Sequence, residues 1–469
     1  MDGGAVVDPR TGDVAEKRSI LISGGRIVAV ESVGDAATDT STQRIDIAGK
    51  FVTPGYNDMH SHVLELDDPS GALALLLSEG VTGVRQMSGS HALLSARRAG
   101  GMTFGDFAPA VLEMPGEVLT PLNAATTDQV KTEITAQHVN GADFIKVGFL
   151  APPVFEVAMR EAKRVGLRIL GHLQDGVDAA GSAREGFHSI EHLGPGATIW
   201  IACSTEEESL KSDAKPVRIK APPAGVPFLK DLISWRVQTM LINPSAFVPP
   251  EYAARLQRAF QSFDEGKADA LCGLFNEQGT WHVPTLVRLR TQELADAPEY
   301  ATHDYLRYMP AWKIKRWRGV TKKFSKLPAP MRQAFAAAYP KQLMLTKFLS
   351  DKGVRMLTGS DGGWLSAPGL TLQEEFIELA KAGLSPLKIL QMTTINAAEY
   401  LRRTDAMGAV EPGRNADLVL LDANPLERVE NLGRIAGVVR NGRHFSRRDL
   451  DALKDRVAMG RGYLNGATP

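Results

Sequence analysis

The chain has 469 residues, of which 43% are hydrophobic and 23% are charged, a composition typical of folded globular proteins and unlike that of disordered ones. Lys plus Arg and Asp plus Glu each total 54, so the formal net charge is zero. This balance excludes the bulk basicity that attracts nucleic acid or an anionic membrane surface.

The first 53 residues have the pattern of short strands joined by tight turns. RSILI and RIVAV flank the turn SGG, which predicts a β-hairpin. RIDI, the turn AGK and FVTPG follow, again without helical periodicity. The chain therefore begins with a β segment.

From Gly55 onward, predicted strands alternate with predicted helices. The helices cover residues 69–79, 90–99, 128–139, 152–165 and 175–185, and Gly or Asn-Gly follows them as a stop signal. The apolar runs between them are VTGVRQM, FAPAVLEM, ADFIKVGFL, LRILGHL and FHSIEHL. This alternation predicts a parallel sheet covered by helices, and periodicity alone fits a barrel and an open sheet equally well.

The second half of the core has a less regular pattern. Residues 196–279 are rich in Pro, Ser and charge, which predicts a long loop region with some helix, whereas residues 288–348 are mostly helical. TWHVPTL is predicted as strand seven, and VRMLTGSD as the last strand of the core. Helices follow over residues 372–381 and 386–401, the second with Ser385 as its cap.

The end of the chain returns to β character. DLVLLD and GVVRNGRHF are predicted strands, and the second contains an Asn-Gly hairpin turn. Because β segments at both ends flank the βα core, we predict a composite β domain from residues 1–53 and 405–448. Residues 54–404 then form the core domain, and residues 449–469 are a C-terminal tail.

Cysteine content and the first residues bear on location. Cys203 and Cys272 are too few for a disulfide framework and fit a reducing compartment. The start, MDGGAVVDPRTGD, lacks the pattern of a signal peptide, and no run reaches the roughly 20 apolar residues of a membrane span. We expect a cytoplasmic homo-oligomer that binds a small-molecule substrate and neither nucleic acid nor a membrane.

Potential metal ligands stand at the ends of five predicted strands. His60 and His62 are two residues apart, so on a strand both imidazoles face the same side. Lys146 is either a lysine that reaches solvent or one held neutral and chemically modified. Taken singly, each residue has an ordinary structural explanation, but five strand ends together favour a metal site. The set is His60, His62, Lys146, His172, His192 and Asp361. These N and O donors suit Zn, Mn, Co, Ni or Fe.

The sequence resembles the amidohydrolase superfamily, in the form that binds two metals. The resemblance runs through VTPGYNDMHSH, GADFIKVG, GHLQDG, SIEHLG and TGSDGG to INAAEYL and MGAVEPGRNADLVLLDANPL. It covers nearly the whole chain and leans toward the dipeptidase and imidazolonepropionase-like branch, with some similarity to hydrolases of carbamate and urea xenobiotics. It implies an α/β fold, a (β/α)8 TIM-type barrel with a small β-sandwich built from both chain ends.

The same resemblance implies the roles of the ligands. His60, His62 and Asp361 would bind one divalent metal, zinc in the first place, and His172 and His192 would bind another. Lys146, carboxylated by CO2, would bridge the two metals together with a hydroxide. The hydroxide would attack a C–N bond of an amide, carbamate or urea in a neutral, partly apolar substrate, and Asp361 would accept and return the proton.

Some alternatives stay open at this point. An Xaa-dipeptidase acting through the same site is the main one, and a deaminase or a non-catalytic barrel are others. GHLQDG lacks the glutamate expected in the deaminase branch, since Gln174 and Asp175 follow Leu173. Gln86 and His282 are candidate substrate residues, although packing explains His282 as well. The aromatic and basic run 305–324 is either a lid over the substrate or a solvated helix face.

Overall fold

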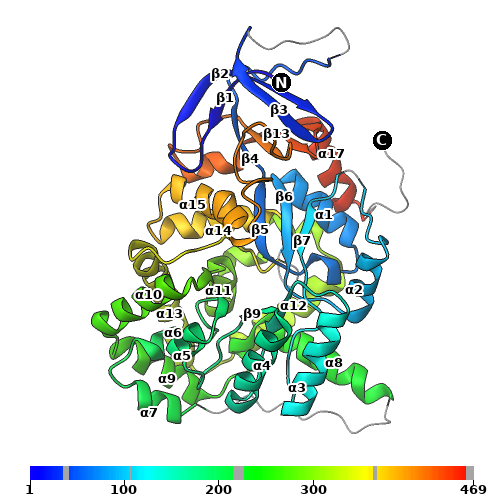
Figure 1. The fold of residues 1–469 in the computed structure, drawn as a ribbon. Helices are drawn as coiled ribbons and strands as arrows, with labels where there is room; N and C mark the ends of the chain where they lie inside the picture. The colour runs from blue at the N-terminus through cyan, green and yellow to red at the C-terminus, as the bar shows by residue number, and fades with distance from the viewer. Residues whose placement is uncertain (35–41, 106, 196, 215–226, 363–366, 461–469) are drawn as a thin grey trace. The chain divides into compact units, whose positions relative to one another are not determined.

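The computed structural model describes residues 1–34, 42–105, 107–195, 197–214, 227–362 and 367–460, with the side chains of 227–234 left aside (Figure 1). The chain divides into two compact units. The first unit contains residues 1–85, 103–112 and 357–469, and the second contains residues 86–102 and 113–356.

A seven-stranded sheet in the first unit draws its strands from both ends of the chain. Its order is β14-β13-β12-β4-β1-β2-β3. The strands are β1 (Asp2–Val7), β2 (Val14–Ser23), β3 (Arg26–Ser32), β4 (Phe51–Pro54), β12 (Leu418–Leu421), β13 (Ile435–Arg440) and β14 (Arg443–Ser446). The β2–β3 hairpin and the Asn-Gly hairpin between β13 and β14 confirm the two turns read from the sequence.

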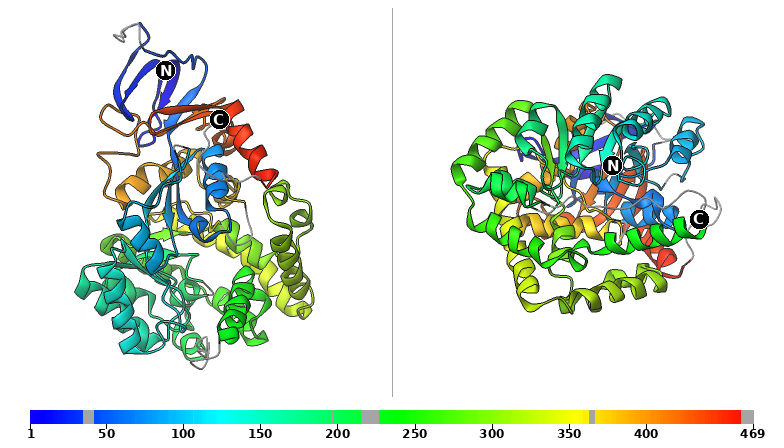
Figure 2. Two further views of the ribbon diagram at one scale, coloured as in Figure 1. Left: turned by 90° about the vertical axis from the view of Figure 1, so that its right-hand side faces the viewer. Right: turned by 90° about the horizontal axis from the view of Figure 1, so that it is seen from below.

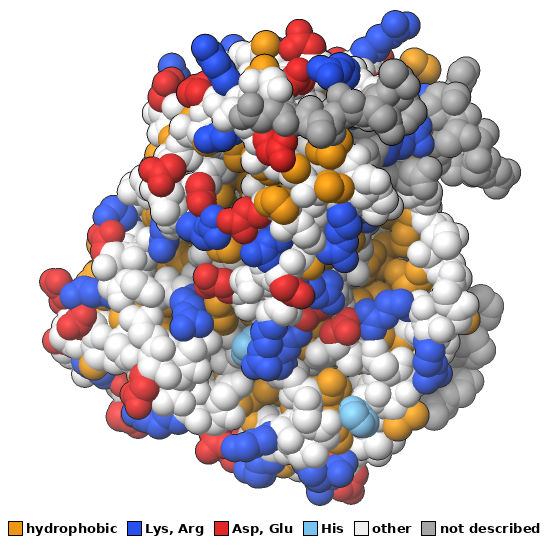
Figure 3. Space-filling view, turned by 45° about the horizontal axis from the view of Figure 1, so that its top comes forward, with side chains coloured by type: hydrophobic (Ala, Val, Ile, Leu, Met, Phe, Trp, Pro, Cys, Tyr) orange, Lys and Arg blue, Asp and Glu red, His pale blue; other side chains and the backbone are white. Residues whose placement is uncertain are grey.

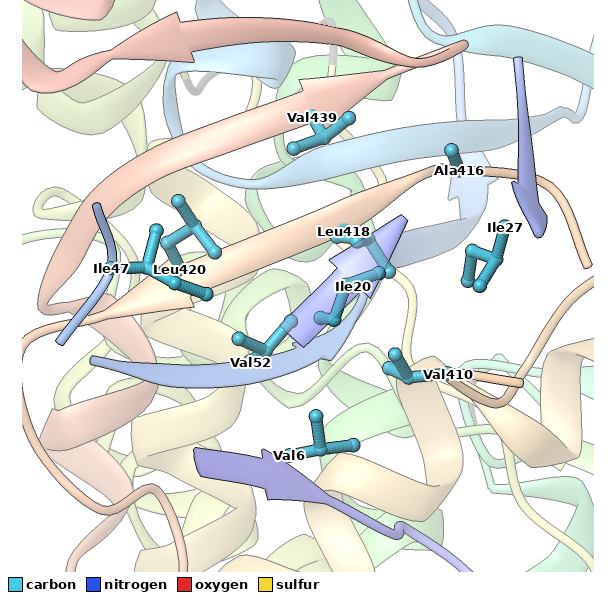
Figure 4. Packing of buried hydrophobic residues seen from close by; sticks show 10 residues of the cluster. All are labelled: Val6, Ile20, Ile27, Ile47, Val52, Val410, Ala416, Leu418, Leu420 and Val439. Carbon is cyan, nitrogen blue, oxygen red and sulfur yellow. The ribbon is translucent and has the colours of Figure 1, made fainter. Parts of the chain in front are cut away.

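The two ends of the chain meet where β4 pairs with β12. That pairing is antiparallel, and β4 is also parallel to β1. Apolar residues of the sheet and of the segments next to its strands form a buried cluster (Figure 4), whose members are Val6, Ile20, Ile27, Ile47, Val52, Val410, Ala416, Leu418, Leu420 and Val439. Burial of this apolar surface holds the N-terminal and C-terminal strands together. The division at residues 53 and 405 stays a prediction.

The first unit also contains the three-stranded sheet β5-β6-β7. Its strands are β5 (Tyr56–Ser61), β6 (Val81–Gln86) and β7 (Ala110–Glu113), the last residues of β6 and β7 lying at the boundary of the unit. The helices are α1 (Pro69–Ser78), α14 (Leu370–Lys381), α15 (Pro386–Thr393), α16 (Ile395–Tyr400) and α17 (Arg447–Ala458).

Two of these helices differ from the prediction. The helix predicted over 386–401 is broken at Thr394, whose ψ of −87° is not helical. The predicted tail begins with α17, which lies beside β13 and β14 (Figure 2) and buries Leu450 and Leu453. Ser446 and Asp449 form a capping box that starts α17, a signal present in the sequence.

The second unit is built around a four-stranded parallel sheet of order β11-β10-β9-β8. Its strands are β8 (Phe144–Val147), β9 (Arg168–Gly171), β10 (Phe187–Glu191) and β11 (Trp281–Val283). Helices α4 (Pro152–Val165) and α5 (Ala179–Arg184) connect β8 to β9 and β9 to β10. Gly166 ends α4 in the left-handed conformation, as the sequence predicts. This βα alternation places the ends of β8, β9 and β10 along one edge of the sheet.

Further helices complete the second unit. Before β8 come α2 (His91–Arg98), capped by Ser90, and α3 (Thr127–Val139), which packs beside α4 (Figure 2). After β11 come α11 (Leu286–Glu293), α12 (Ala311–Phe324) and α13 (Ala329–Asp351), so the helical prediction for 288–348 is confirmed. α12 buries Trp317, Val320 and Phe324, which is the arrangement of a solvated amphipathic helix.

The described part of residues 196–279, predicted as a long loop region with some helix, contains more helix than expected. It contains α6 (Thr198–Ala202), α7 (Glu207–Ser212), α8 (Pro227–Ile242), α9 (Pro250–Gln261) and α10 (Glu265–Gln278). Local start signals outweigh the loop-like composition, because Pro250 opens α9 and Asp264 accepts a hydrogen bond from Lys267 N at the start of α10. In the same way α5 begins only at Ala179, after its cap Asp178.

Neither unit offers a membrane-spanning element among its described helices, since none is both long and apolar enough. On the face in Figure 3, basic and acidic side chains are interspersed, as the balanced charge of the chain implies. The fold has the α/β character that the sequence predicts.

Candidate metal centre

Three of the predicted ligands, His60, His62 and Asp361, come together in the first unit and are called here the β5 group. Backbone hydrogen bonds hold residues 358–362 alongside β5, from Asp361 N to His60 O (2.8 Å) and from His62 N to Gly362 O (2.9 Å). The predicted last strand is therefore present as a paired segment, although it is too irregular to form a regular strand.

The side chains of the β5 group converge on one carboxylate oxygen. Asp361 Oδ1 lies 3.1 Å from His62 Nε2 and 3.4 Å from His60 Nε2. Two atoms bound to one tetrahedral zinc ion at about 2.0–2.1 Å lie roughly 3.3–3.4 Å apart. Each imidazole nitrogen therefore lies at about ligand spacing from Asp361 Oδ1, and two imidazoles with one carboxylate are a donor set that such an ion accepts.

Asp361 reaches this position through an unusual backbone conformation. Its φ is +50°, in the left-handed region, where a residue other than glycine is uncommon. Asp361 is 9% exposed and His60 is 1% exposed, so the group is withdrawn from bulk water. Left-handed, non-glycine residues cluster at functional sites, where the surrounding structure holds them.

The electrostatics of His62 favour a cation at this place. Burial by itself lowers the pKa of His62, but the carboxylates of Asp361 and Glu65 outweigh it and raise the pKa to about 9. Glu65 Oε2 lies 3.9 Å from His62 Nδ1, on the side of the ring away from the Nε2 that faces Asp361. A divalent ion would replace the proton as the positive charge in this group.

The other three predicted ligands, Lys146, His172 and His192, come together in the second unit and are called here the β8–β10 group. Lys146 lies within β8. His172 directly follows the last residue of β9, and His192 directly follows the last residue of β10. The rings of His172 and His192 have centroids 5.0 Å apart at 68°. Lys146 is 2% exposed, so the interpretation of a lysine that reaches solvent is wrong.

A glycine permits the close packing around Lys146. Gly171 has φ +127°, and a Cβ on it would lie 2.4 Å from Val147 O and 2.9 Å from Lys146 Cδ. Any side chain at position 171 would therefore displace β8 or the lysine. His172 follows at once and donates its backbone N–H to Val147 O (3.0 Å), which fixes the two ligands relative to each other.

The orientation of His192 is set by Thr285. The Thr285 hydroxyl donates its one proton to Pro284 O (2.8 Å), so it accepts the hydrogen bond from His192 Nδ1 (2.5 Å). Nε2 of His192 then carries the lone pair that can bind a metal, and the hydrogen bond to Nδ1 is the support that metal-binding histidines usually have. Both His192 and Thr285 have positive φ, +55° and +46°.

The two predicted substrate residues lie elsewhere in the second unit. His282, in β11, is fully buried, and its ring packs on Phe275 of α10 with centroids 4.7 Å apart. Burial lowers the pKa of His282 to about 3, so the ring is neutral. Gln86 is buried and donates from Nε2 to Ser88 O (2.9 Å). These contacts are those of packing residues, and the substrate roles stay predictions.

Sequence reasoning missed the residues that support the ligands. Thr285 had no recognisable signal, because its partner His192 is distant in sequence. Asp58 had such a signal, because residues 58, 60 and 62 follow the two-residue spacing that puts side chains on one side of a strand. Of the six predicted ligands, each unit brings three together.

A family model and curated relatives match parts of the chain. Residues 337–444 match the family model described as the amidohydrolase family, a stretch that includes Asp361. Adenine deaminase 2 of Jannaschia sp. (strain CCS1) is 40% identical over 83 residues, which are 18% of this chain and 13% of that protein. The chain thus spans well under two thirds of this curated relative.

Solved structures resemble the chain over nearly its whole length. Bottromycin amidohydrolase has a TM-score of 0.70 at 22% identity, covering 98% of this chain and 90% of that one. A Xaa-Pro dipeptidase with bound methionine in the active site has a TM-score of 0.61 at 18% identity, covering 95% and 98%. Residues 337–444 are therefore similar to the amidohydrolase family, and the chain has the α/β fold of these solved structures.

Proposed function

We propose that the chain is a metal-dependent hydrolase of C–N bonds in small amides, carbamates or ureas. In this proposal the β5 group and the β8–β10 group belong to one centre, at the carboxyl ends of the strands of a closed (β/α)8 barrel. The seven-stranded sheet, with strands from both chain ends, corresponds to the small β-sandwich. The likeness to amidohydrolase-superfamily structures over 98% of the chain supports this assembly.

The observation that carries the proposal is the convergence of His60 and His62 on Asp361 Oδ1, at 3.4 and 3.1 Å. Strand pairing would not by itself bring two imidazole nitrogens and a carboxylate oxygen to the spacing of ligands. In the proposal, His60, His62 and Asp361 hold one divalent ion, and His172 and His192 hold a second. Lys146, as a carbamate formed with CO2, would provide oxygen ligands to these ions, and zinc is the metal proposed first.

Divalent ions bound there would supply a Lewis acid and lower the pKa of water to near neutrality. The chain's own residues do the remaining work. The carboxylate of Asp361 accepts the proton of the attacking water and delivers it to the leaving nitrogen. An amine is released, together with a carboxylic acid from an amide, a carbonic half-ester from a carbamate or a carbamic acid from a urea. The burial of His60 and Asp361 keeps bulk water from competing for these proton transfers.

Lys146 fits the carbamate proposal because of its burial. An ammonium group inside an apolar strand is costly to keep charged, so the neutral amine that reacts with CO2 is favoured. The resulting carbamate would provide the oxygen ligands that the lysine nitrogen alone cannot share between two ions. Position 171 must be glycine for this side chain to fit.

An Xaa-dipeptidase is the second candidate. The solved Xaa-Pro dipeptidase covers 95% of this chain and supports a peptide-like substrate. A deaminase has weaker support, because the adenine deaminase match covers only 18% of the chain. A non-catalytic barrel is disfavoured, since both groups retain their ligands. We also propose a homo-oligomer, to be tested by light scattering.

The experiment is a substrate panel with defined metal. The protein is reconstituted with Zn2+, Mn2+ or Co2+ and supplied with N-acyl amino acids, Xaa-Pro and other dipeptides, carbamates, ureas and adenine. Released amine and ammonia are measured separately. Hydrolysis of an amide-type compound that is lost in D361N supports the proposal. Ammonia from adenine alone, with K146A fully active, would assign a deaminase instead.

A further inference from the structure

A buried carboxylate joins the two backbone segments of the β5 group. Asp58, in β5, is 0% exposed. Its Oδ1 accepts hydrogen bonds from His60 N (3.1 Å) and from Ser360 N (3.0 Å). Its Oδ2 accepts the hydroxyl proton of Ser360 (2.5 Å). One side chain thus contacts the backbone at His60 and the residue immediately before Asp361.

The Ser360 hydroxyl extends this contact past Asp361. Its proton goes to Asp58, and its oxygen accepts the backbone N–H of Gly362 (3.0 Å). The backbone N–H groups of Ser360 and Gly362, the residues on both sides of Asp361, are therefore tied to one carboxylate, that of Ser360 directly and that of Gly362 through the Ser360 hydroxyl. Asp361 itself stands at φ +50°, a conformation that persists only where its surroundings fix it.

Strand pairing alone does not require such a carboxylate. The backbone bond from Asp361 N to His60 O already sets the register. Burying a carboxyl group is costly unless hydrogen bonds satisfy it, and here three donors do so. The presence of the buried Asp58 carboxyl beside His60 and Asp361 is explained if this carboxyl fixes the geometry of these two ligands.

We propose that Asp58 and Ser360 are positioning residues that hold Asp361 Oδ1 at ligand distance from the two imidazoles of the β5 group. The inference rests on the proposed function, because it assigns these residues a purpose toward the ion that His60, His62 and Asp361 would hold. Neither residue contributes a ligand. Their effect is to keep the 3.1 and 3.4 Å spacings from widening.

The variants D58N and S360A test the inference. D58N keeps the shape of the side chain but removes one of its two acceptor oxygens, and S360A removes both the donor to Asp58 and the acceptor for Gly362 N. Supporting residues of this kind typically change metal affinity about 10–100-fold. The matched control is S78A, in which a buried hydroxyl that bonds Leu75 O in α1 is lost.

Three readouts separate positioning from a merely structural role. The affinity for Co2+ is measured by chelator competition, the coordination by the visible spectrum of the Co2+ form, and the fold by the thermal transition of the metal-free protein. We expect D58N and S360A each to lose at least tenfold in Co2+ affinity with an altered spectrum. The double variant should lose little more than either single one, and S78A should match the wild type.

Unchanged Co2+ affinity and spectrum in both variants, whatever happens to thermal stability, would overturn the inference. If D58N does not fold, S360A decides the result alone. A wild-type protein that binds no Co2+ would instead overturn the proposed function itself, which is a different and earlier failure in the same experiment.

Discussion

Replacing Arg255 with methionine would leave a buried carboxylate without its cation. Arg255 of α9 forms an ion pair with Asp175, and the two side chains are 9% and 15% exposed. Asp175 Oδ1 also accepts a hydrogen bond from Ala197 N (3.3 Å) and lies 3.4 Å from Thr198 Oγ1, whose proton goes to Leu173 O (2.7 Å). The carboxylate therefore connects α9 with the segments that follow His172 and His192.

The expected cost follows from this burial. Removing one partner of a buried ion pair costs about 3–5 kcal/mol, because the remaining charge is uncompensated. Asp175 keeps the long hydrogen bond from Ala197 N and some exposure, so we expect about 3 kcal/mol, near the lower end. At about 2–4 °C per kcal/mol for a domain of this size, R255M should lower the Tm by about 6–12 °C.

The double variant R255M/D175L checks the reason for the loss. With both charges gone, no buried charge is left unpaired, and most of the stability should return. R258M is the control on the same helix, since Arg258 pairs with Glu206 and Asp213 at the surface, and it should change little. The assay is thermal and urea unfolding of the metal-free protein. A Tm for R255M that lies within about 2 °C of the wild-type Tm would refute the reasoning, because it corresponds to a loss of roughly 1 kcal/mol or less in the free energy of unfolding.

Three further predictions concern single side chains. T285V keeps the shape of Thr285 but removes the acceptor for His192 Nδ1. Metal affinity, measured by chelator competition, should therefore fall about 10–100-fold. An unchanged affinity would count against the His192 tautomer that carries its proton on Nδ1. G171A should destabilise far more than G141A, because both positions have positive φ but only a Cβ at 171 meets a backbone oxygen, at 2.4 Å; equal unfolding midpoints would contradict the packing. Burial raises the pKa of Glu293 to about 8, so its contribution to stability is present at low pH and is lost as pH rises from about 4.5 to 8, with a slope of up to about 1.4 kcal/mol per pH unit. E293Q should flatten that fall in urea unfolding, and a profile identical to the wild type would disprove it.

Local signals explain what could be predicted from the sequence. Gly166 stops α4, Ser90 caps α2, and the hairpins form at SGG and Asn-Gly because these features act within a few residues. The candidate metal ligands at strand ends could likewise be predicted from the alternation of strands and helices alone. These inferences hold because the determining contacts are close in sequence.

The remainder depends on contacts between distant residues. Asp58 and Ser360 are 302 positions apart, and nothing near Ser360 indicates its hydrogen bond. The helices between residues 198 and 278 were predicted only as some helix within a loop region, because their composition is polar. Burial of residues such as Trp200 and Leu256 stabilises them. The segment before Asp361 reads as a strand but is held by only a few backbone bonds.

The most direct test of the central claim is the metal content of three purified proteins after reconstitution and dialysis. The wild type, the pair variant H60A/H62A and the pair variant H172A/H192A are compared by elemental analysis. The proposal predicts two ions per wild-type chain and a loss of bound metal in each pair variant, with the fold retained. A wild type with less than one ion per chain, or pair variants that bind as much as the wild type, would contradict it.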